Sequence, residues 1–533
     1  MSKPLATIAY NATVAKLIEP SREIKMEIQN ALSYAVEGAE HSTAFKGGGW
    51  DGRSSFFEFK NATFPAGFVA LAVSALTKSG YKISLVKRPL PDLLGPLVPV
   101  VDNFPEDDRY DYQRATVAKL AQHGRMIAQV ATGGGKSKIA RLAYARISRP
   151  TLFLTTRSIL MYQMKESFER DMKIPCSVLG DGQFGRVDAE GNTKVGKLCV
   201  GMVQTLISRL QTPDSSKNKA HQAKQALIRQ QTINLLSQFE FVIGEEAHEA
   251  SGNGYYEILK YCKNAYYRLA LTATPFMKDG EESNMRLMGC FGPIGVRVSE
   301  KLLIDRQILA KPIFKYVQLT ERPVGLFRST PWQAAYRLGI VGDESRNRHI
   351  VFEAARAAKH GLSSMVLIQQ KAHGSALKKL FDAQGVKTIF IAGENDQDER
   401  KRALAKLANR EIDVLIGSTI LDVGVDVPAV GMVILAGGGK AEVALRQRIG
   451  RGLRAKKKGP NIAHVVDFSD GFNDHLKQHS LQRQRIVNET PGFVENVLPR
   501  AQDFDYRPFS EEQELPAMPF DPNIQINKKD CGD

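Results

Sequence analysis

The sequence has few cysteines and no long apolar run, and both features narrow what the chain can be. Its five cysteines are odd in number, scattered, and form no C-x-x-C pair: Cys176, Cys199, Cys262, Cys290 and Cys531. We therefore expect neither a disulfide framework nor a zinc site. No apolar run is long enough to span a bilayer, and the N-terminus lacks the residue order of a secretory signal. These absences predict a cytoplasmic protein with no membrane association.

Positive charge, in contrast, is in excess. Lys and Arg total 73 against 57 Asp and Glu, which gives a formal net charge of +16. Such a balance draws a protein toward polyanions, and nucleic acid is the obvious candidate. A solvated basic surface kept for solubility explains the charge equally well. The ordinary fractions of hydrophobic (43%) and charged (24%) residues predict a multidomain globular protein with normal cores.

Short apolar runs alternate with helical patterns over most of the chain. Runs of this kind are typical of buried parallel strands, and they occur at 151–155, 239–244, 365–368, 388–391, 413–416, 432–435 and 463–466. Between them lie helical patterns such as 158–172 and 375–385, the latter ending on a glycine that suits a helix C-cap. The alternation predicts an α/β protein with doubly wound parallel sheets.

The spacing of these strands predicts five segments. Two α/β lobes are expected at 101–310 and 345–480, joined by a linker at 311–344 that contains proline and arginine. Residues 1–100 mix aromatic, apolar and glycine residues, which predicts a small α+β domain. A tail with little periodicity is expected at 481–533. Within the first lobe, the polar stretch 215–232 predicts an inserted exposed helix.

The segment VATGGGKSKIARLAYA, residues 130–145, predicts a phosphate-binding loop of the Walker A type. Its glycines allow backbone N–H groups to approach phosphates, and the helix that follows presents its positive end. Lys136 can reach the β- and γ-phosphates, and the Ser137 hydroxyl can ligate Mg²⁺. The first position of the strict pattern holds Val130 instead of glycine. A flexible strand-to-helix turn therefore stays open as the alternative.

Two adjacent acids follow the apolar run 241–243. Glu245 and Glu246 stand directly after Gly244, and adjacent carboxylates repel unless water or a positive ion separates them. In a phosphate-loop fold, one such acid holds the metal ion and the next orients and deprotonates the attacking water. Glu245-x-x-His248 also matches the Glu-x-x-His motif of di-iron helical bundles. That alternative needs a second motif on long helices, whereas the surrounding sequence has the character of strands.

The motifs between residues 109 and 455 resemble, in order, those of superfamily 2 helicases and translocases. The segments that carry the resemblance are RYDYQRATVAKL, VATGGGKS, TLFLTTRSILMYQM, VGMVQTL, EEAH, LTATP, VLIGSTILDVGVDVP and QRIGRGLR. EEAH departs from the family pattern, because Glu245 stands where the family usually has Asp. The resemblance implies two tandem RecA-like lobes that hydrolyse ATP with Mg²⁺ and move along nucleic acid.

The resemblance also implies roles for individual residues. Catalytic roles fall on Lys136, Glu246, Gln447, Arg451 and Arg454, with the two arginines as fingers on the phosphates. Contacts to ATP fall on Gln113, Thr132, Gly133, Gly134, Gly135, Lys136, Ser137, Gly424 and Asp426, and contacts to the metal on Ser137 and Glu245. Coupling between hydrolysis and the nucleic-acid track falls on His248, Thr272 and Thr274. Taken without the resemblance, the two threonines read equally as strand residues and Asp426 as a turn residue.

Other segments resemble one particular group within superfamily 2. GGGWDGR (47–53) and FPAGFVALAVSALTKSGYKISLV (64–86) resemble the N-terminal module of the bacteriophage UvsW-type helicases, which remodel branched DNA. GIVGDESRNRHIV (339–351) and IAGENDQDERKRALAKLA (391–408) resemble the same group. The resemblance implies branched or forked DNA as the partner, a monomer or weak oligomer, and the host-cell cytoplasm if a phage encodes the protein.

DNA contacts are expected in the N-terminal module and in both lobes. Within the module they fall on Trp50, Arg53 and Phe56, because aromatic rings stack on bases and Arg holds phosphates. A lone Trp is more often a core residue, which is the open alternative for Trp50. Within the lobes, the resemblance implies DNA contacts at Arg157, Gln204, Thr205 and Thr419.

Three alternative functions stay open at this point. An RNA helicase shares the motor motifs, although EEAH is not DEAD and the N-terminal resemblance is to a DNA-remodelling family. A nucleotide-dependent clamp that binds DNA with little turnover is motivated by the unusual Glu245. A restriction-type translocase is disfavoured because the sequence shows no cluster of nuclease acids.

Overall fold

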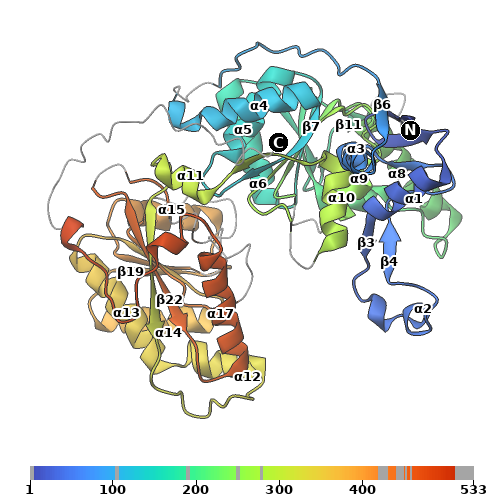
Figure 1. Ribbon diagram of the computed structural model, residues 1–533. Coiled ribbons are helices and arrows are strands. Elements are labelled where there is room, and N and C mark those ends of the chain that lie inside the picture. The colour runs from blue at the N-terminus through green and yellow to red at the C-terminus, as the bar shows by residue number, and fades with distance from the viewer. Residues whose placement is uncertain are drawn as a thin grey trace. The chain divides into compact units, whose positions relative to one another are not determined.

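The structure is a computed structural model that describes residues 5–101, 107–187, 193–247, 253–276, 280–417, 430–439, 449, 453–456 and 459–509. The described residues form two compact units, one of 5–130 and 135–298 and the other of 131–134 and 299–509. Figure 1 labels their helices and strands. Within the described ranges, no helix combines the length and the apolar character needed to cross a membrane.

The N-terminal part of the first unit is a small four-stranded sheet with two helices. The strand order is β5-β2-β1-β6, with β1 antiparallel to β2 and parallel to β6. Ile8 and Leu17 face a core shared with both helices. The elements are β1 (Leu5–Tyr10), β2 (Val14–Ile18), α1 (Arg22–Ala31), β5 (Thr63–Pro65), α3 (Val69–Lys78) and β6 (Lys82–Lys87). This arrangement confirms the predicted α+β character.

A second, two-stranded sheet extends from this part. It pairs β3 (Ser33–Ala35) with β4 (Arg53–Ser55) in antiparallel fashion. The chain between them carries the 3₁₀ turn η1 (Ala39–His41) and the short helix α2 (Thr43–Lys46). Figure 1 shows α2 at the end of an arm that projects from the unit.

The larger part of the first unit is an eight-stranded sheet in the order β10-β9-β13-β8-β14-β15-β7-β16, parallel except for β10. Every residue of β8, β14 and β15 is buried, as expected for strands covered on both faces. The strands are β7 (Arg125–Val130), β8 (Thr151–Thr155), β9 (Cys176–Gly180), β10 (Gln183–Phe184), β13 (Leu198–Met202), β14 (Phe241–Glu245), β15 (Tyr267–Thr272) and β16 (Ile294–Val298). The helices are α4 (Asp111–His123), α5 (Lys136–Ile147), α6 (Ser158–Met172), α7 (Val203–Leu210), α8 (Lys219–Leu236), α9 (Asn253–Leu259) and α10 (Glu281–Phe291).

The N-terminal sheet and the larger sheet share a packed interface within the first unit. A Cβ atom added to Gly67, in the 3₁₀ turn η2 (Ala66–Phe68), would lie 2.2 Å from the carbonyl oxygen of Met288 on α10. The ring of Phe56 lies 5.7 Å from that of Tyr256, between ring centroids. The Arg125 guanidinium donates to the carbonyl of Ala12 at 2.9 Å. The backbones therefore meet closely, with no room for a larger residue at Gly67.

The second unit is built on a six-stranded parallel sheet in the order β17-β22-β21-β18-β20-β19. Its strands are β17 (Lys311–Gln318), β18 (Ser364–Leu367), β19 (Thr388–Ile391), β20 (Val414–Gly417), β21 (Met432–Ile434) and β22 (Ile462–Ser469). Its helices are α11 (Glu300–Asp305), α12 (Trp332–Tyr336), the π-helical turn η4 (Arg337–Val341), α13 (Glu344–Lys359), α14 (Lys371–Ala383), α15 (Gln397–Ala408) and α17 (Asp474–Asn488). Two separate parallel sheets confirm the predicted pair of α/β lobes.

Two segments differ from their sequence-based reading. Residues 311–344, expected to be a linker, include β17, which pairs along its length with β22 as an edge strand. Residues 481–509 were expected to belong to a tail with little periodicity. They include the second half of α17, up to Asn488, and a following segment that packs back onto the second unit. Val497 forms a bridge with Phe314 on β17, while Phe504 and Tyr506 are buried in the core of the second unit.

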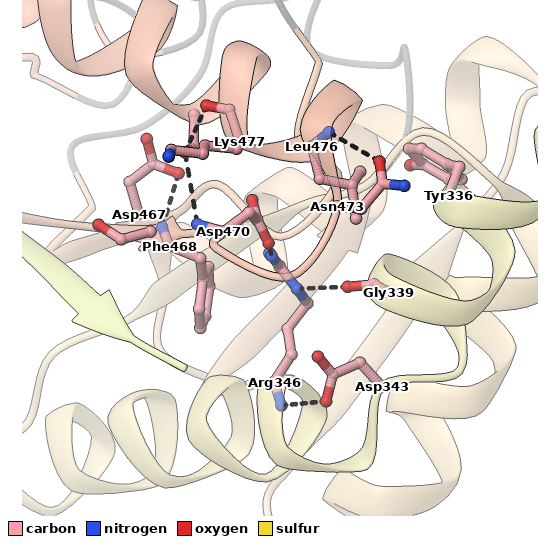
Figure 2. A network of polar contacts seen from close by, with 12 residues as sticks. Tyr336, Gly339, Asp343, Arg346, Asp467, Phe468, Asp470, Asn473, Leu476 and Lys477 are labelled. Carbon is pink, nitrogen blue, oxygen red and sulfur yellow. Dashed lines mark hydrogen bonds and ion pairs between the residues drawn. The ribbon is translucent and has the colours of Figure 1, made fainter. Parts of the chain in front are cut away.

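Buried ion pairs tie the helices of the second unit to its sheet. Arg346 on α13 is fully buried (0% exposed) and pairs with Asp470, directly after β22. Figure 2 shows its guanidinium between Asp470 and the carbonyl of Gly339, which accepts a hydrogen bond at 3.3 Å. Arg483 on α17 pairs with Asp467 at 3.0 Å between Nε and Oδ2. Removing one member of such a pair leaves an uncompensated buried charge, which is strongly destabilising.

Candidate nucleotide-binding site

The candidate site lies along the carboxyl edge of the eight-stranded sheet. Parallel pairing places Glu245, the last residue of β14, beside Leu271 on β15, and Thr272 beside Gln129 on β7. The strands β7, β14 and β15 therefore end at one edge. Because ligands of open α/β sheets bind outside the carboxyl ends of the strands, this register brings the three predicted motifs together.

The glycine loop follows β7 and leads directly into α5. Gly133 and Gly135 have φ angles of 89° and 78°, which favour glycine. A hydrogen bond of 3.0 Å from the Gly134 N–H to the Ala131 carbonyl tightens the turn. Lys136 is the first residue of α5, so the loop leads to the positive end of a twelve-residue helix. Such an end is suited to bind phosphate.

Gln113 borders this loop. It lies on α4 and is buried, at 2% exposed. A Cβ atom added to Gly135 would come within 2.4 Å of its Nε2 atom. The amide that the motif resemblance assigns to ATP therefore meets the phosphate loop, and Gly135 leaves the space that the contact needs.

Lys136 and Glu246 face each other at the same place. Their Nζ and Oε1 atoms are 3.6 Å apart, and the two side chains are only 11% and 14% exposed. A cation that can bind phosphate and a carboxylate that can accept a proton thus share one sheltered position. These are the two groups that the motif resemblance assigns to phosphate binding and to proton transfer.

The backbone turns sharply between the two adjacent acids. Glu245 completes β14 and is buried (6% exposed), whereas Glu246 has a φ angle of 45° and leaves the strand direction. Its N–H donates to the Leu271 carbonyl at 3.0 Å. The two acids therefore differ in backbone conformation, and Glu246 lies 3.6 Å from the Lys136 ammonium. Glu245 supplies a buried carboxylate, an oxygen ligand of the kind that Mg²⁺ takes, and its role at the metal stays a prediction.

Tyr255 on α9 supports this turn, although no sequence motif marks it. Its fully buried hydroxyl lies 2.7 Å from the Glu245 carbonyl and 3.2 Å from the Leu154 carbonyl. The side chain therefore joins the ends of β8 and β14. A tyrosine ten residues beyond Glu245 gives no local signal, because its hydroxyl contacts backbone carbonyls, which every residue carries.

The segment 272–274, within the LTATP motif, is held by a residue that the sequence analysis did not single out. The Thr274 N–H donates to the Thr272 hydroxyl at 3.2 Å, and Thr272 is fully buried. Gln129, at the end of β7, donates from Nε2 to the Ala273 carbonyl at 3.4 Å. The segment 272–274 is thereby linked to the strand that carries the phosphate loop.

Three residues predicted to contact DNA lie along the same sheet edge. Arg157 follows β8 and precedes α6, while Gln204 and Thr205 lie in the first turn of α7, directly after β13. Gln204 is exposed and Thr205 is half-buried. The parallel strands thus place these residues and the nucleotide motifs at one edge of the sheet.

In the N-terminal module, the predicted contacts are partly engaged within the protein. The Trp50 indole donates to the Arg53 carbonyl at 2.6 Å. The Arg53 guanidinium donates to Ser33 at 3.1 Å and lies 3.4 Å from Glu281, while staying exposed. The ring of Phe56 packs against three other aromatic rings, those of Tyr34, Phe68 and Tyr256. Phe56 is half-buried and engaged in this packing, and its role in stacking on bases stays a prediction.

Fewer of the expected residues can be placed in the second unit. Arg454 is exposed and forms an isolated bridge with Leu309. Six expected residues lie outside the described ranges: His248, Thr419, Gly424, Asp426, Gln447 and Arg451.

Comparisons with known proteins agree with this layout. The family profile described as "DNA helicase UvsW, N-terminal" matches residues 8–86, "Type III restriction enzyme, res subunit" matches 107–277, and "Helicase conserved C-terminal domain" matches 347–456. Together they match more than half of the chain in the order of its three structural parts.

One relative matches nearly end to end. The ATP-dependent DNA helicase uvsW of Enterobacteria phage T4 is 23% identical over 501 residues, which cover 88% of this chain and 94% of the relative. The chain belongs to the UvsW-type superfamily 2 helicases. As a member of this family, it is an ATP-hydrolysing DNA helicase that uses ATP with a divalent metal ion.

Two further similarities cover less of this chain. The DNA 3'-5' translocase XPB2 of Sulfurisphaera tokodaii is 25% identical over 67% of this chain and 81% of its own length. Among solved structures, the fragment of a putative HsdR subunit of a type I restriction enzyme from Vibrio vulnificus YJ016 has a TM-score of 0.50 at 17% identity. It covers 75% of this chain and 69% of that one. The second similarity concerns the fold alone.

Proposed function

We propose that this UvsW-type helicase remodels branched DNA by branch migration or fork regression, driven by hydrolysis of Mg²⁺-ATP. The observation that carries the proposal is the close interface between the N-terminal module and α10 of the first lobe, where Gly67 meets the Met288 backbone. A module that packs this closely moves together with the lobe. A DNA arm held by the module would therefore be displaced as the motor steps.

We assign the chemical roles to residues of the first lobe. Lys136 binds the β- and γ-phosphates, and Glu246, 3.6 Å away, orients the attacking water and accepts its proton. Ser137 and Glu245 would hold Mg²⁺, which supplies charge neutralisation on the phosphate oxygens. Gln113 contacts the nucleotide next to Gly135.

Further roles complete the proposal. Thr272 and Thr274 transmit the change to the DNA track, with His248 as their neighbour in that relay. Arg157, Gln204 and Thr205 hold the strand on the first lobe, and Thr419 holds it on the second. Trp50 and Arg53 contact DNA on the N-terminal module. Arg451 and Arg454 act as fingers on the phosphates, with Gln447 beside them, while Gly424 and Asp426 contribute to nucleotide binding.

The test is a panel of ATPase and unwinding measurements on single strands, duplexes, forks and four-way junctions of equal nucleotide content. We expect junctions and forks to give the strongest stimulation and to be converted to branch-migrated products. The Lys136→Ala variant serves as the inactive control. Equal stimulation by linear duplexes and junctions would refute the remodelling role, and preference for an RNA duplex would favour an RNA helicase instead.

A further inference from the structure

Helix α10 turns one face toward the N-terminal module, from its first turn to its last. The residues of this face stand at helical spacing: Glu281, Met285, Met288 and Gly289. Met285 and Met288 pack against the core of the module, and a Cβ atom added to Gly289 would lie 2.9 Å from the Phe68 ring. Residues of the opposite face belong to the core of the large sheet. The helix is therefore held from both sides.

Glu281 is the charged residue of this face, and it reaches the base of the arm that projects from the module. Figure 1 shows this arm, residues 33–55, with α2 at its far end. The Oε2 atom of Glu281 accepts a hydrogen bond of 2.7 Å from the backbone N–H of Ala35 on β3. Its Oε1 atom lies 3.4 Å from Nη2 of Arg53 on β4. One carboxylate of the lobe therefore contacts both strands of the arm.

The hydrogen bond contributes more to this contact than the ion pair does. The side chains of Arg53 and Glu281 are 45% and 49% exposed, and ion pairs between exposed side chains contribute little. The bond from Ala35 is short and has a charged acceptor, which makes it about twice as strong as a bond between neutral groups. Glu281 thus holds the backbone of β3, and Arg53 adds a second, weaker contact.

The same carboxylate orients a residue that is predicted to contact DNA. Arg53 donates to the Ser33 carbonyl at 3.1 Å and faces Glu281, in both cases through Nη2. Because the side chain is 45% exposed, its other N–H groups can donate to a phosphate. The Trp50 indole donates to the Arg53 carbonyl at 2.6 Å. The placement of both predicted contacts, Trp50 and Arg53, therefore depends on where Glu281 holds the arm.

The helix that carries Glu281 also follows a motif of the motor. Among the described residues, α10 is the next helix after the LTATP segment, 271–275, which is predicted to couple hydrolysis to the DNA track. Within that segment, Thr272 ends β15, which lies between the strand that leads to the phosphate loop and the strand that ends at Glu245. The arm is thus attached to the lobe at an element that begins close to the nucleotide site in the chain.

We propose that Glu281 is a positioning residue that gives the helicase its preference for branched DNA, by fixing the arm and Arg53 relative to the first lobe. The inference rests on the proposed function, since it names a residue that sets specificity for the same substrate. A loosened arm would still meet phosphates, but it would hold a branch at no fixed distance from the strand on the lobe. Preference for branches needs that distance, whereas activity on single strands does not.

The test compares Glu281→Ala with Glu282→Ala as its matched control. Both acids lie in the first turn of α10, so each substitution removes the same favourable charge from the start of the helix. Glu282 pairs with Arg286 of the same helix at 2.5 Å, so its partner is on α10 itself. A third variant, Glu281→Gln, removes the charge and keeps an acceptor for the Ala35 N–H.

ATPase activity of each variant is measured against the concentration of a four-way junction and of a single strand. The preference is the ratio of the two DNA concentrations that give half-maximal stimulation. Melting curves check that the three variants fold like the unaltered protein.

We expect Glu281→Ala to reduce the preference for the junction about tenfold, because loss of a hydrogen bond to a charged group has an effect of this size. Maximal activity on single strands should not change, because the nucleotide site is left intact. Glu281→Gln should lose less of the preference than Glu281→Ala, and Glu282→Ala should keep all of it.

Three outcomes would overturn the inference. An unchanged preference in Glu281→Ala would show that the contact does not set specificity. An equal loss in Glu282→Ala would assign the effect to the start of α10 in general. A similar loss of stimulation by both DNAs in Glu281→Ala would show that the residue supports the motor as a whole. Failure of the proposed function looks different, because the unaltered protein would then show no preference for branched DNA.

Discussion

Two loops of the chain share the sequence GGGK, and their glycines lie in different surroundings. One occupies residues 133–136 after β7, and the other occupies 437–440 after β21. Each follows a strand of a parallel sheet. In each, the third glycine has a positive φ angle and is approached by a glutamine amide, with Gln113 Nε2 at 2.4 Å and Gln369 Nε2 at 2.3 Å from an added Cβ.

The loops differ in what surrounds them. The first leads into α5 and lies where Lys136 meets Glu246. In the second, the carbonyls accept hydrogen bonds from protein side chains. Gly437 accepts from the Tyr336 hydroxyl at 2.8 Å, Gly438 from Gln369 at 3.2 Å and Gly439 from Arg483 at 2.9 Å.

The difference teaches that glycine supplies only freedom of the backbone. In the first loop, the N-terminus of α5 and Lys136 follow the glycines, as is typical of phosphate sites, whereas residues 440–448 after the second loop lie outside the described ranges. The second loop instead joins a network of buried polar groups, of which Figure 2 shows the part around Arg346 and Asp470. Its donors are side chains that already hold the carbonyls, so the loop is a structural joint.

The largest effect is expected from replacing the acid that faces the first loop. Replacement of Glu246 with Gln should lower kcat for ATP hydrolysis by about 10² to 10⁴, because a positioned base contributes that much. ATP binding should be retained, since Lys136 and the glycine loop stay in place. Steady-state hydrolysis and equilibrium nucleotide binding measure the two quantities separately. Normal turnover in this variant would show that Glu246 is not the base.

Low pH should lower the stability of the second unit, which contains the second GGGK loop, before that of the first unit. Burial lowers the pKa of His373 and of His464 to about 3, with nearby positive charge adding to the effect. Both rings therefore stay neutral in the folded protein, whereas the unfolded chain takes up protons below its ordinary pKa of about 6.5. Stability is complete above pH 6.5 and is lost as pH falls toward 3, by about 1.4 kcal/mol per pH unit for each ring.

Hydrogen exchange resolved by peptide measures this loss, with the first unit as the internal control. Between pH 7 and pH 5.5, we expect protection factors, which correct for the intrinsic pH dependence of amide exchange, to fall more in β18, β21 and β22 than in β7, β14 and β15. An equal fall in both units would contradict the role of the two buried histidines.

A matched pair of substitutions separates the functions of the two loops. Gly135→Ala and Gly439→Ala each force a side chain into a positive φ angle, of 78° and 95°, at a cost of about 1–3 kcal/mol. The first should weaken ATP binding roughly tenfold, which corresponds to this strain. The second should lower the free energy of unfolding of the second unit and leave the KM for ATP unchanged. Urea unfolding and ATPase kinetics on both variants test the contrast, which fails if the two effects are exchanged.

The smallest effect concerns the acid that departs from the family pattern. Glu245→Asp shortens a buried side chain by one methylene at the end of β14. Mg²⁺ keeps several waters and meets only one or two carboxylates, so kcat should stay within about threefold of its original value or rise. A complete loss of ATP hydrolysis would show that the site depends on glutamate at this position.

Local patterns allowed much of the fold to be predicted. Strand 151–155 and helix 158–172 occur as expected, because apolar periodicity over a few residues decides such elements. The reading of 311–344 as a linker missed β17, since Pro312 argues against a central strand. Proline is tolerated in an edge strand, which is the position of β17.

The candidate site was predictable where residues act through their own side chains. Lys136 and Glu246 could be found because the phosphate loop and the paired acids are local motifs. Tyr255 and Gln129 could not, because each contacts a backbone carbonyl that only the folded chain brings near. The inserted helix was predicted at 215–232, and the structure places it at 219–236 as α8.

The sequence by itself determined the motor: two parallel α/β lobes, a glycine loop with its lysine, and two acids at a strand tip. These features depend on neighbouring residues, so they are visible in the order of the letters. Only the tertiary structure decided which GGGK loop faces a reactive pair and which is held through its carbonyls. It also decided that the chain near Phe504 and Tyr506 completes a core. These outcomes depend on groups far apart in the sequence, which pack together only when the sheets form.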